Sequence, residues 1–452
     1  MKLHEAFNVS RGDVIAFIGA GGKTSTLIRL GHELADEGWR VLATTTTRIA
    51  DEQLELMPYA TTLEGGVQNL SRALTEHHFV YLYDDIRQKK VYGPPLERIP
   101  ELLDSVDSDV LLIEADGARQ LLLKAPYEHE PVIPPETSLV VPIASLGILG
   151  KPLTDEYVYN AEAIMSRYGF VKGNRVRSPW VAQVLRDEEL GLRGIPDNAR
   201  VVALINGTPK QGYLRGRARL IAQLALRSSR LNGVVLGNVR GAQAAHEVQR
   251  HIGAVILAAG MSTRMGQMKV LLPWTGGKTI IEHIIEQAFR SRFNYTVVVT
   301  GHRGEEVRKI ARAAGAKTAH NRAYKNGEML SSLKTGLRAM PKHISAALVI
   351  LGDQPRIEPR VIYQLLAAYA EQKGEIVAPR FNKQRGHPVL IDRKYWPELL
   401  ALRGNSAPRD VLNAHEDSIH YIDVTTDSVL RDVDTPQDYE RERWRAGLSP
   451  HD

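Results

Sequence analysis

Apolar positions in the first fifty residues predict a strand, a helix and a second strand. Residues 14–18 form a short apolar run, and residues 40–47 form another. Between them, three leucines recur at the spacing of one helix face: Leu27, Leu30 and Leu34. We therefore expect a helix over 24–37, ended by Gly38. A strand, a glycine-containing loop, a helix and a strand in this order begin a parallel α/β sheet.

The rest of the first half contains further apolar runs and a more polar stretch. Residues 109–117 and 200–207 each predict a strand. Residues from about 151 to 200 are more polar, and we expect this part to be largely helical. The segment Gly241–Gly253 interrupts the pattern, so we expect the boundary between two domains there.

After this segment, the alternation of strands and helices begins again. The pattern predicts strands at 254–260, 295–301, 346–353 and 375–379, and helices at 280–289, 305–314, 329–340 and 360–371. Such alternation is typical of a doubly wound sheet. The predicted fold is therefore α/β, with two Rossmann-like, three-layer, parallel-sheet domains in tandem. We expect the first, with a P-loop-like turn, over 1–240 and the second over 252–448.

Composition favours a globular protein with small anionic ligands. The 452 residues are 43% hydrophobic and 24% charged, with a formal net charge of +6. No block of Lys and Arg and no RNA-binding signature accompanies this charge, so nucleotides fit better than nucleic acid.

The residue types also exclude several kinds of site. The chain has no cysteine, which excludes disulfides, cysteine-held zinc and a cysteine nucleophile. A bound metal must then use oxygen or imidazole ligands, which favours ions such as Mg²⁺. The N-terminus lacks the apolar segment of a signal peptide, and the longest apolar stretch, 138–150, is too short to span a bilayer. We expect a cytoplasmic protein that does not enter membranes.

The loop "LAAGMSTRMGQMK" at 257–269 has the residues of a phosphate-binding segment. The loop begins at Leu257, and the small residues that follow, Ala258, Ala259 and Gly260, let the backbone approach a ligand closely. Arg264 and Lys269 add two cations, so that the loop suits a triphosphate. A surface loop with two solvated cations is an equally good explanation of the loop alone.

Carboxylates elsewhere in the second half favour the nucleotide site. In "LGDQP", Asp353 lies at the carboxyl end of an apolar strand, where open α/β sheets bind ligands. In "DVDTPQDY", Asp432 and Asp434 precede a proline. Two carboxylates from separate loops, together with phosphate oxygens and water, complete the octahedron of Mg²⁺. Taken singly, each aspartate is more typical of a turn or a helix cap.

These segments resemble a known family. From about Gly253 to Arg445 the chain is similar to the molybdenum cofactor nucleotidyltransferases, and most to their cytidylyltransferase branch. Five segments carry the resemblance in the family's order: "LAAGMSTRMGQMK", "NGEMLSSLKTGL", "LGDQP", "RGHPVL" and "DVDTPQDY". The resemblance implies a nucleotide-diphospho-sugar-transferase-like fold and Mg²⁺-dependent transfer of CMP from CTP to a molybdopterin-type cofactor, with release of pyrophosphate. The guanylyl branch has a glycine where Ala259 stands, and a methyl group there would crowd the base pocket.

The same resemblance implies roles for individual residues. Asp353 and Asp434 would hold Mg²⁺. Arg264 and Lys269 would stabilise the leaving pyrophosphate. Arg385 and His387, from "RGHPVL", would contact the acceptor, although a hydrogen-bonded turn histidine explains His387 equally well.

The loop "FIGAGGKTST" in the first half has the parts of a phosphate-binding loop. Its glycines and its Lys-Thr pair stand at the start of the predicted helix: Gly19, Gly21, Gly22, Lys23 and Thr24. The spacing is shorter than that of the standard P-loop, and a tight turn without a ligand also explains the glycines. Glu114 and Asp116 end a later strand, where a carboxylate facing a metal is expected.

Residues 1 to about 235 resemble the accessory proteins of selenium-dependent molybdenum hydroxylases. The shared segments are "GAGGKT", "TTTTR", "EADGARQLLLKAPYEHEPVIP" and "LGKPLTDE". The resemblance implies a role in maturing a molybdenum- or selenium-containing cofactor, with a molybdenum hydroxylase as a partner. In the third segment, Lys124, Glu128 and His129 either line a pocket or decorate a proline-rich loop.

Three functions therefore remain open from the sequence. The first is a two-domain cofactor-maturation enzyme: a cytidylyltransferase with a nucleotide-binding accessory domain. The second is a nucleotidyltransferase for sugar phosphates or other small molecules. The third is a non-catalytic protein that delivers the cofactor to a hydroxylase.

Overall fold

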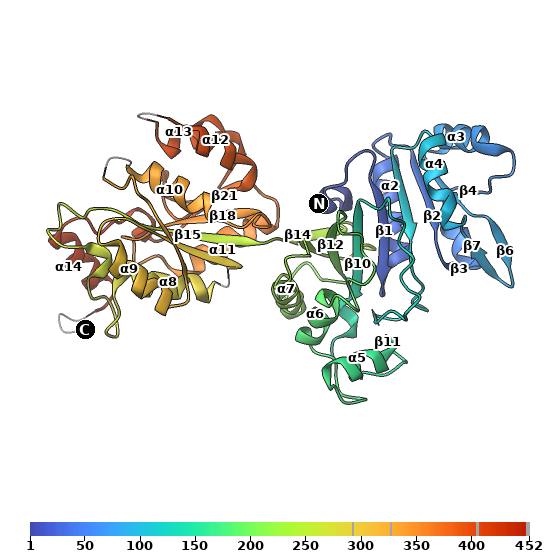
Figure 1. Ribbon diagram of the computed structural model, residues 1–452, viewed down its shortest axis with the longest axis horizontal. Coiled ribbons are helices and arrows are strands. Elements are labelled where there is room, and N and C mark those ends of the chain that lie inside the picture. Colours follow the sequence, from blue (N-terminus) through green and yellow to red (C-terminus); the bar gives the residue numbers. More distant parts are fainter. Residues whose placement is uncertain (292, 326–327, 404–405, 449–452) are drawn as a thin grey trace. The chain divides into compact units, whose positions relative to one another are not determined.

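The computed structural model describes residues 1–291, 293–325, 328–403 and 406–448. The chain forms two compact units, Met1–Gln249 and Arg250–Asp452 (Figure 1). Residues 245–249, which lie inside the segment where we expected the boundary, form the last strand of the first unit.

The first unit is built on a nine-stranded sheet. Its strands are β1 (Val14–Gly19), β2 (Val41–Thr45), β4 (Ala60–Thr61), β5 (Phe79–Leu82), β8 (Val110–Glu114), β10 (Leu139–Ser145), β12 (Arg200–Asn206), β13 (Gly233–Gly237) and β14 (Ala245–Gln249). They lie in the order β14-β13-β12-β10-β1-β8-β2-β5-β4. Neighbours pair in parallel, except that β14 runs antiparallel to β13 at one edge.

Helices cover both faces of this sheet (Figure 1). They are α1 (Leu3–Phe7), α2 (Lys23–Ala35), α3 (Gly66–His77), α4 (Ile99–Ser105), α5 (Ala161–Tyr168), α6 (Ser178–Arg186) and α7 (Tyr213–Ala225). Successive side chains of a strand point to opposite faces. Accordingly, Phe17 of β1 packs with Leu30 of α2, whereas Ile18 packs with Leu74 of α3. The run 14–18 is apolar throughout because both of its faces are covered.

Two small sheets accompany the large one. β3 (Arg48–Ala50), β6 (Asp85–Arg87) and β7 (Lys90–Tyr92) form an antiparallel sheet, and β9 (Leu123–Lys124) pairs with β11 (Val158–Tyr159). The stretch 151–200, which we expected to be largely helical, contains α5, α6 and β11, with turns between them.

The second unit has an eight-stranded sheet. Its strands are β15 (Ile252–Ala258), β16 (Tyr295–Thr300), β17 (Lys317–His320), β18 (Ala346–Leu351), β19 (Ile376–Phe381), β20 (Gln384–Arg385), β21 (Val389–Asp392) and β22 (Ile419–Asp423). The order is β17-β16-β15-β18-β21-β19-β20, and β22 pairs with β19. β17, β16, β15 and β18 are parallel to one another, and β21 is antiparallel to both of its neighbours.

Helices again lie on both faces of the sheet (Figure 1). They are α8 (Ile280–Arg290), α9 (Gly304–Ala313), α10 (Glu328–Arg338), α11 (Pro359–Ala370), α12 (Trp396–Ala401), α13 (Pro408–Ala414) and α14 (Pro436–Arg445). Ile256 of β15 packs with Ile285 of α8, and its neighbour Val255 packs with Leu337 of α10 on the other face.

The predicted fold class, two three-layer α/β domains dominated by parallel strands, is confirmed. The antiparallel strands are β14 in the first sheet and β20 and β21 in the second. β21 follows β19 and β20 after a short connection. A parallel crossover requires a dozen or more residues, so this connection returns the chain antiparallel.

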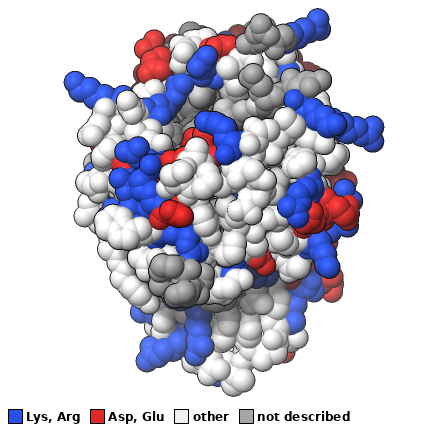
Figure 2. All heavy atoms as spheres, turned by 90° about the vertical axis from the view of Figure 1, so that its left-hand side faces the viewer, with Lys and Arg blue, Asp and Glu red and all other residues white. Residues whose placement is uncertain are grey.

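The surface facing the viewer in Figure 2 carries Lys and Arg side chains interspersed with Asp and Glu. On this face, the net positive charge is therefore not gathered into one basic patch. No helix in the described part of the chain is long and apolar enough to cross a membrane.

The edge strand β14 is attached to α7 by a buried carboxylate, which gives a test of the first unit. The side chain of Glu247 is 0% exposed, and its Oε1 lies 2.7 Å from Arg219 Nη2. Arg215 also contacts Oε1, and Gln249 Nε2 donates to Oε2. We expect Glu247→Ala to reduce the free energy of unfolding by about 3 kcal/mol, because the guanidinium groups lose their buried partner. Urea unfolding followed by circular dichroism measures this.

The matched control for this test is Glu64→Ala, at an exposed glutamate of the same unit. We expect it to change the unfolding free energy by less than about 0.5 kcal/mol. Equal midpoints for the two variants would contradict the role of Glu247.

Candidate functional site

In the second unit, the segments that contain the predicted site residues meet where β15 and β18 end. Gly352, just after β18, donates its N–H to Leu257 O at 2.9 Å. A Cβ at position 352 would come within 2.5 Å of that oxygen, so this approach requires glycine. The residue after it is Asp353, whose carbonyl oxygen accepts a hydrogen bond from Val433 N at 2.9 Å. The backbone thus joins "LAAG", "LGDQP" and "DVDTPQDY".

The four predicted catalytic residues form one ion-pair cluster. Lys269 Nζ contacts Asp353 Oδ2 and lies 3.0 Å from Asp434 Oδ1. Arg264 Nη2 lies 2.8 Å from Asp434 Oδ2. Two cations from one loop and two carboxylates from two others are thereby brought together.

Lys269 stays charged in this cluster. Burial on its own would lower the pKa of the Lys269 ammonium, but Asp353 and Asp434 outweigh burial and raise it above the ordinary value of 10.5. Arg264 is different, because 71% of its side chain is exposed. The Arg264 side chain can therefore leave Asp434 and turn toward a ligand.

Asp432 has a different environment from Asp434. Burial, and then the negative charge of Asp353, raise the pKa of Asp432. Its Oδ1 accepts a hydrogen bond of 2.6 Å from Gln354 Nε2. Of Asp432 and Asp434, it is Asp434 that contacts Lys269.

The donor set of the cluster fits Mg²⁺. Asp353 and Asp434 present carboxylate oxygens to a single ammonium, which stands where a cation is favoured. Within the described ranges, no group of three or more His, Cys, Asp and Glu could hold a metal. Asp353 and Asp434 would supply two carboxylate ligands, and phosphate and water the remaining ones.

The nucleotide-binding residues predicted in this half lie at the end of β15. Leu257 and Ala258 belong to the strand, and Gly260 has open space where a side chain would begin. Ala259 is 3% exposed, and a Cβ at Gly301 would come within 2.8 Å of its methyl carbon. The methyl group therefore faces Gly301 from within the core cluster, and its effect on the base pocket stays a prediction.

Arg385 and His387 were predicted to contact an acceptor. Arg385 Nη2 donates to Asn413 Oδ1 at 3.3 Å. Burial lowers the pKa of His387 to about 4, although the nearby Asp353 opposes the shift. His387 is thus neutral near pH 7. Asn326 and Gly327, which begin "NGEMLSSLKTGL", lie outside the described residues.

In the first unit, the loop between β1 and α2 is formed by glycines that no other residue replaces without strain. Gly21 has φ +88° and Gly22 has φ +135°, values that favour glycine. A Cβ at position 21 would lie 2.5 Å from Ser145 Cβ. Asn206 Nδ2 donates to Gly21 O at 2.8 Å and supports the loop from the end of β12.

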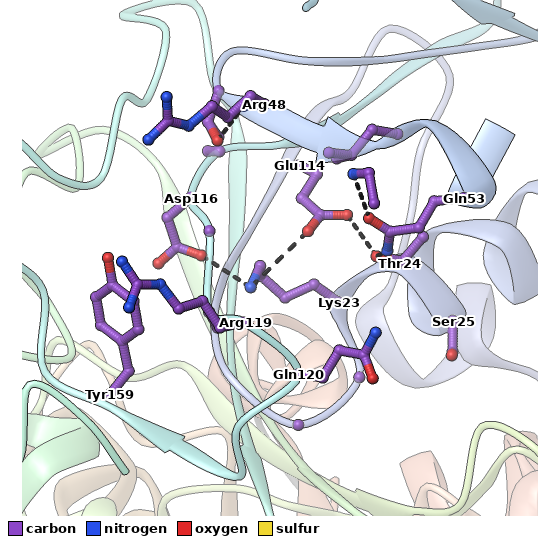
Figure 3. A pocket seen from close by; sticks show the side chains of 18 of the residues that line it. Lys23, Thr24, Ser25, Arg48, Gln53, Glu114, Asp116, Arg119, Gln120 and Tyr159 are labelled. Atoms are coloured by element: carbon purple, nitrogen blue, oxygen red, sulfur yellow. Dashed lines mark hydrogen bonds and ion pairs between the residues drawn. The ribbon is translucent and has the colours of Figure 1, made fainter. Parts of the chain in front are cut away.

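Lys23 is the centre of a buried charge network (Figure 3). Its Nζ donates to Gly19 O at 2.8 Å, and lies 3.1 Å from Asp116 Oδ1 and 3.8 Å from Glu114 Oε1. Asp116 Oδ2 accepts a hydrogen bond of 2.9 Å from Gly19 N and lies 3.2 Å from Lys124 Nζ. Lys124 in turn lies 2.9 Å from Glu130 Oε2.

Thr24 connects the loop to the same network. Its hydroxyl donates to Glu114 Oε2 at 2.7 Å and accepts a hydrogen bond of 3.0 Å from Gln53 Nε2. Burial raises the pKa of Glu114, and Lys23 opposes this rise. Burial alone would lower the pKa of Lys23, but Asp116 and Glu114 raise it. A lysine, a hydroxyl and two carboxylates at the start of a helix are the groups that hold a metal-bound phosphate.

This loop opens into a cavity of about 1300 Å³. Four of the five predicted residues line the cavity: Gly21, Gly22, Lys23 and Thr24. The fifth, Gly19, accepts a hydrogen bond from Lys23 through its carbonyl oxygen. Of the proline-rich segment, His129 lines the cavity and Lys124 is buried beside it, whereas Glu128 is exposed.

Sequence reasoning missed several residues that line this cavity: Gln53, Arg119, Gln120, Tyr159 and Asn206. A signal existed for Arg119 and Gln120, which follow the two acids in "EADGARQ". No spacing rule joins Tyr159 of β11 to the loop, because the pairing of β11 with β9 brings it there.

Comparison with known proteins matches each half to a separate family. The model for the YqeC protein matches residues 15–162, and the model for the MobA-like NTP transferase domain matches residues 254–419. Uncharacterized protein YqeC of Escherichia coli (strain K12) is 31% identical over 196 residues, 43% of this chain and 76% of that protein. The chain belongs to the YqeC family through its N-terminal half.

The C-terminal half of this YqeC-family chain is similar to other proteins. The molybdenum cofactor cytidylyltransferase of Escherichia coli (strain K12) is 29% identical over 192 residues, 42% of this chain and 93% of that protein. The crystal structure of Rv0371c from Mycobacterium tuberculosis H37Rv has 25% sequence identity and a TM-score of 0.38, and the match covers 43% of this chain and 98% of that one.

These matches confirm the two-part identification made from the sequence: an accessory-type YqeC domain followed by a MobA-like NTP transferase domain. The C-terminal half of this YqeC-family chain is a nucleotidyltransferase.

The lowered pKa of His387 predicts how stability changes with pH. The folded pKa is about 4 and the ordinary value is 6.5, so the unfolded chain binds more protons between these values. Stability contributed by neutral His387 is therefore present above about pH 6.5 and is lost as the pH falls toward 4. We expect wild type to lose more unfolding free energy than His387→Gln between about pH 7 and about pH 5. Urea unfolding at both pH values measures this, and equal losses would contradict it.

Proposed function

We propose that the C-terminal domain transfers CMP from CTP to a molybdopterin-type cofactor, releases pyrophosphate and requires Mg²⁺. The observation that carries this proposal is the cluster of Arg264 and Lys269 with Asp353 and Asp434. The similarity to a molybdenum cofactor cytidylyltransferase over 93% of its length supports the choice of CTP and of the acceptor.

The reaction needs no covalent intermediate on the protein. An oxygen of the acceptor's terminal phosphate forms a bond to the α-phosphorus of CTP, and the bond from that phosphorus to the bridging oxygen of pyrophosphate breaks. The protein's task is to align these groups and to neutralise their charge. In line with this, the four charged groups of the cluster are paired with one another.

We expect the charges of the cluster to exchange partners when substrate binds. Without phosphate, Lys269 and Arg264 together balance the negative charges of Asp353 and Asp434. With CTP, Lys269 and Arg264 would turn to the leaving pyrophosphate oxygens, and the two carboxylates would be free to hold Mg²⁺. A metal bound there would withdraw negative charge from the phosphates. Lys269, as an ammonium, and exposed Arg264 are suited to this exchange.

Arg385 and His387 are proposed to contact the acceptor. Arg385 carries the positive charge that a phosphorylated acceptor needs. His387, neutral near pH 7, can accept or donate a hydrogen bond according to its tautomer.

We further propose that the N-terminal domain binds a nucleotide and acts as an accessory module in the maturation of a selenium-dependent molybdenum hydroxylase. Membership of the YqeC family and the arrangement of Lys23 and Thr24 beside Glu114 support this. Gly19, Gly21 and Gly22 would let the phosphates approach the backbone.

The first test of the C-terminal site is Asp353→Asn. It removes one carboxylate from the metal and should lower the rate of CMP transfer roughly 100-fold or more. The full chain is incubated with Mg²⁺, molybdenum-loaded molybdopterin and each NTP in turn, and products are identified by mass.

The matched control is Asp417→Asn, at an exposed aspartate of the same domain, which should transfer at the wild-type rate. Near-normal transfer by folded Asp353→Asn would contradict the assignment. Transfer to sugar phosphates instead would favour the second function considered above. No product with any NTP would favour cofactor delivery.

The test of the N-terminal site is Lys23→Met, with Thr24→Ala as a milder variant. Loss of the ammonium should weaken nucleotide binding at the β1–α2 loop at least tenfold, since a charge-assisted contact to phosphate is lost. Pyrophosphate release by the C-terminal domain should be unchanged. Hydrogen exchange of peptides covering 19–26 reports binding at the loop alone, and nucleotide-induced protection that survives in both variants would overturn the proposal.

A further inference from the structure

The cavity of the N-terminal domain is larger than one nucleotide requires. Its volume of about 1300 Å³ exceeds the usual range for a small-molecule site, about 300–1,000 Å³. The β1–α2 loop, where we propose nucleotide phosphates to bind, lies between two groups of lining residues. Asn206, Gly207, Asn238 and Arg240 come from the ends of β12 and β13.

The second group of lining residues comes from the opposite side of β1 in the sheet, where β8 and β2 lie. Thr46 and Arg48 follow β2, which is separated from β1 by β8. Lys90 and Tyr92 belong to β7, which pairs with β3. Arg119 follows β8. Lining residues therefore come from both sides of the loop with Lys23. We call the part lined from the ends of β12 and β13 the first side, and the part lined by Thr46, Arg48, Lys90, Tyr92 and Arg119 the second side.

The acids of the cavity already have cationic partners. Glu114 and Asp116 lie against Lys23, and Asp116 and Glu130 lie against Lys124. These partners are buried, with exposed side-chain fractions of 5% for Lys23 and 1% for Lys124. The three carboxylates of this network outnumber its two ammonium groups by one, and each of the three already lies against a lysine.

The second side carries cations without such partners. Among the residues that the structure describes, Arg48, Lys90 and Arg119 form no ion pair, and all three are exposed to the cavity. Arg119 lies over the ring of Tyr159, 5.8 Å from its centroid. Figure 3 shows Arg48, Arg119 and Tyr159 on the Asp116 side of the Lys23 ammonium, and Thr24 and Gln53 on the Glu114 side.

The backbone at Arg119 has an uncommon conformation. Arg119 and Gln120 are consecutive non-glycine residues with φ of +48° and +60°. This left-handed region is sparsely populated by such residues. Both line the cavity.

We infer that the N-terminal cavity binds two ligands at once: a nucleotide at the β1–α2 loop, and a phosphorylated small molecule on the side of Arg48, Lys90 and Arg119. Guanidinium and ammonium groups without carboxylate partners are suited to phosphate oxygens. Tyr92 and Tyr159 also line this side of the cavity. The inference rests on the nucleotide binding proposed for this loop.

The experiment is hydrogen exchange of the full chain with inorganic pyrophosphate as the probe for the second ligand. The protein is first saturated with Mg²⁺ and AMPPNP, or GMPPNP, and pyrophosphate is then added to millimolar concentration. Peptides separate the two domains, so binding at the C-terminal site does not interfere. We expect the analogue to protect 19–26. Pyrophosphate should then add protection at 46–50, 88–92 and 117–121 without loss at 19–26.

Variants connect the added protection to the cations. Arg119→Ala and Lys90→Ala should each weaken pyrophosphate binding about tenfold and leave protection of 19–26 by the analogue unchanged. The matched controls are Arg227→Ala and Lys172→Ala, at exposed cations of the same domain that do not line the cavity. They should bind pyrophosphate as wild type does.

The outcomes separate this inference from the proposal on which it rests. If neither analogue protects 19–26, the nucleotide proposal fails, and the two-ligand inference fails with it. Protection of 19–26 without any effect of pyrophosphate on the second side would overturn only the two-ligand inference. Displacement of the analogue by pyrophosphate would also overturn it, because one site would then serve both.

Discussion

In each half of this protein, a lysine ammonium is held between two carboxylates where parallel strands end. Lys23 lies against Glu114 and Asp116, and Lys269 against Asp353 and Asp434. Removing an ion from water costs several kcal/mol unless a partner compensates. Each arrangement therefore requires its loops to meet, and the glycines that allow close backbone approach make that possible.

The two clusters differ in how far they are buried. Lys23 and its partners are almost fully enclosed, whereas Arg264 in the other cluster is largely exposed. A buried cluster holds its geometry, and an exposed arginine changes partners at little cost. The C-terminal cluster is thus suited to a reaction in which charge moves from substrate to leaving group. The N-terminal one is suited to holding a phosphate in place.

Much of this could be predicted from the sequence, because apolar runs and glycine loops act locally. The pattern at 14–47 predicted β1, α2 and β2, and the motifs predicted that Asp353 and Asp434 would share a site with Lys269. What sequence could not give depends on contacts between distant segments. Tyr159 reaches the N-terminal cavity through the pairing of β11 with β9. Ala259 stands in the predicted nucleotide-binding loop, yet its methyl group packs against Gly301.

The antiparallel strand β14 has a consequence for any attempt to separate the two halves. It forms the edge of the first sheet, paired to β13, and it ends at Gln249, beside Arg250 of the second unit. A fragment cut at residue 240 would leave the buried, apolar strand β13 as an open edge. Unpaired edges of this kind recruit strands from other molecules. The division that keeps the first domain from aggregating therefore lies after Gln249, at the end of the strand that closes its sheet.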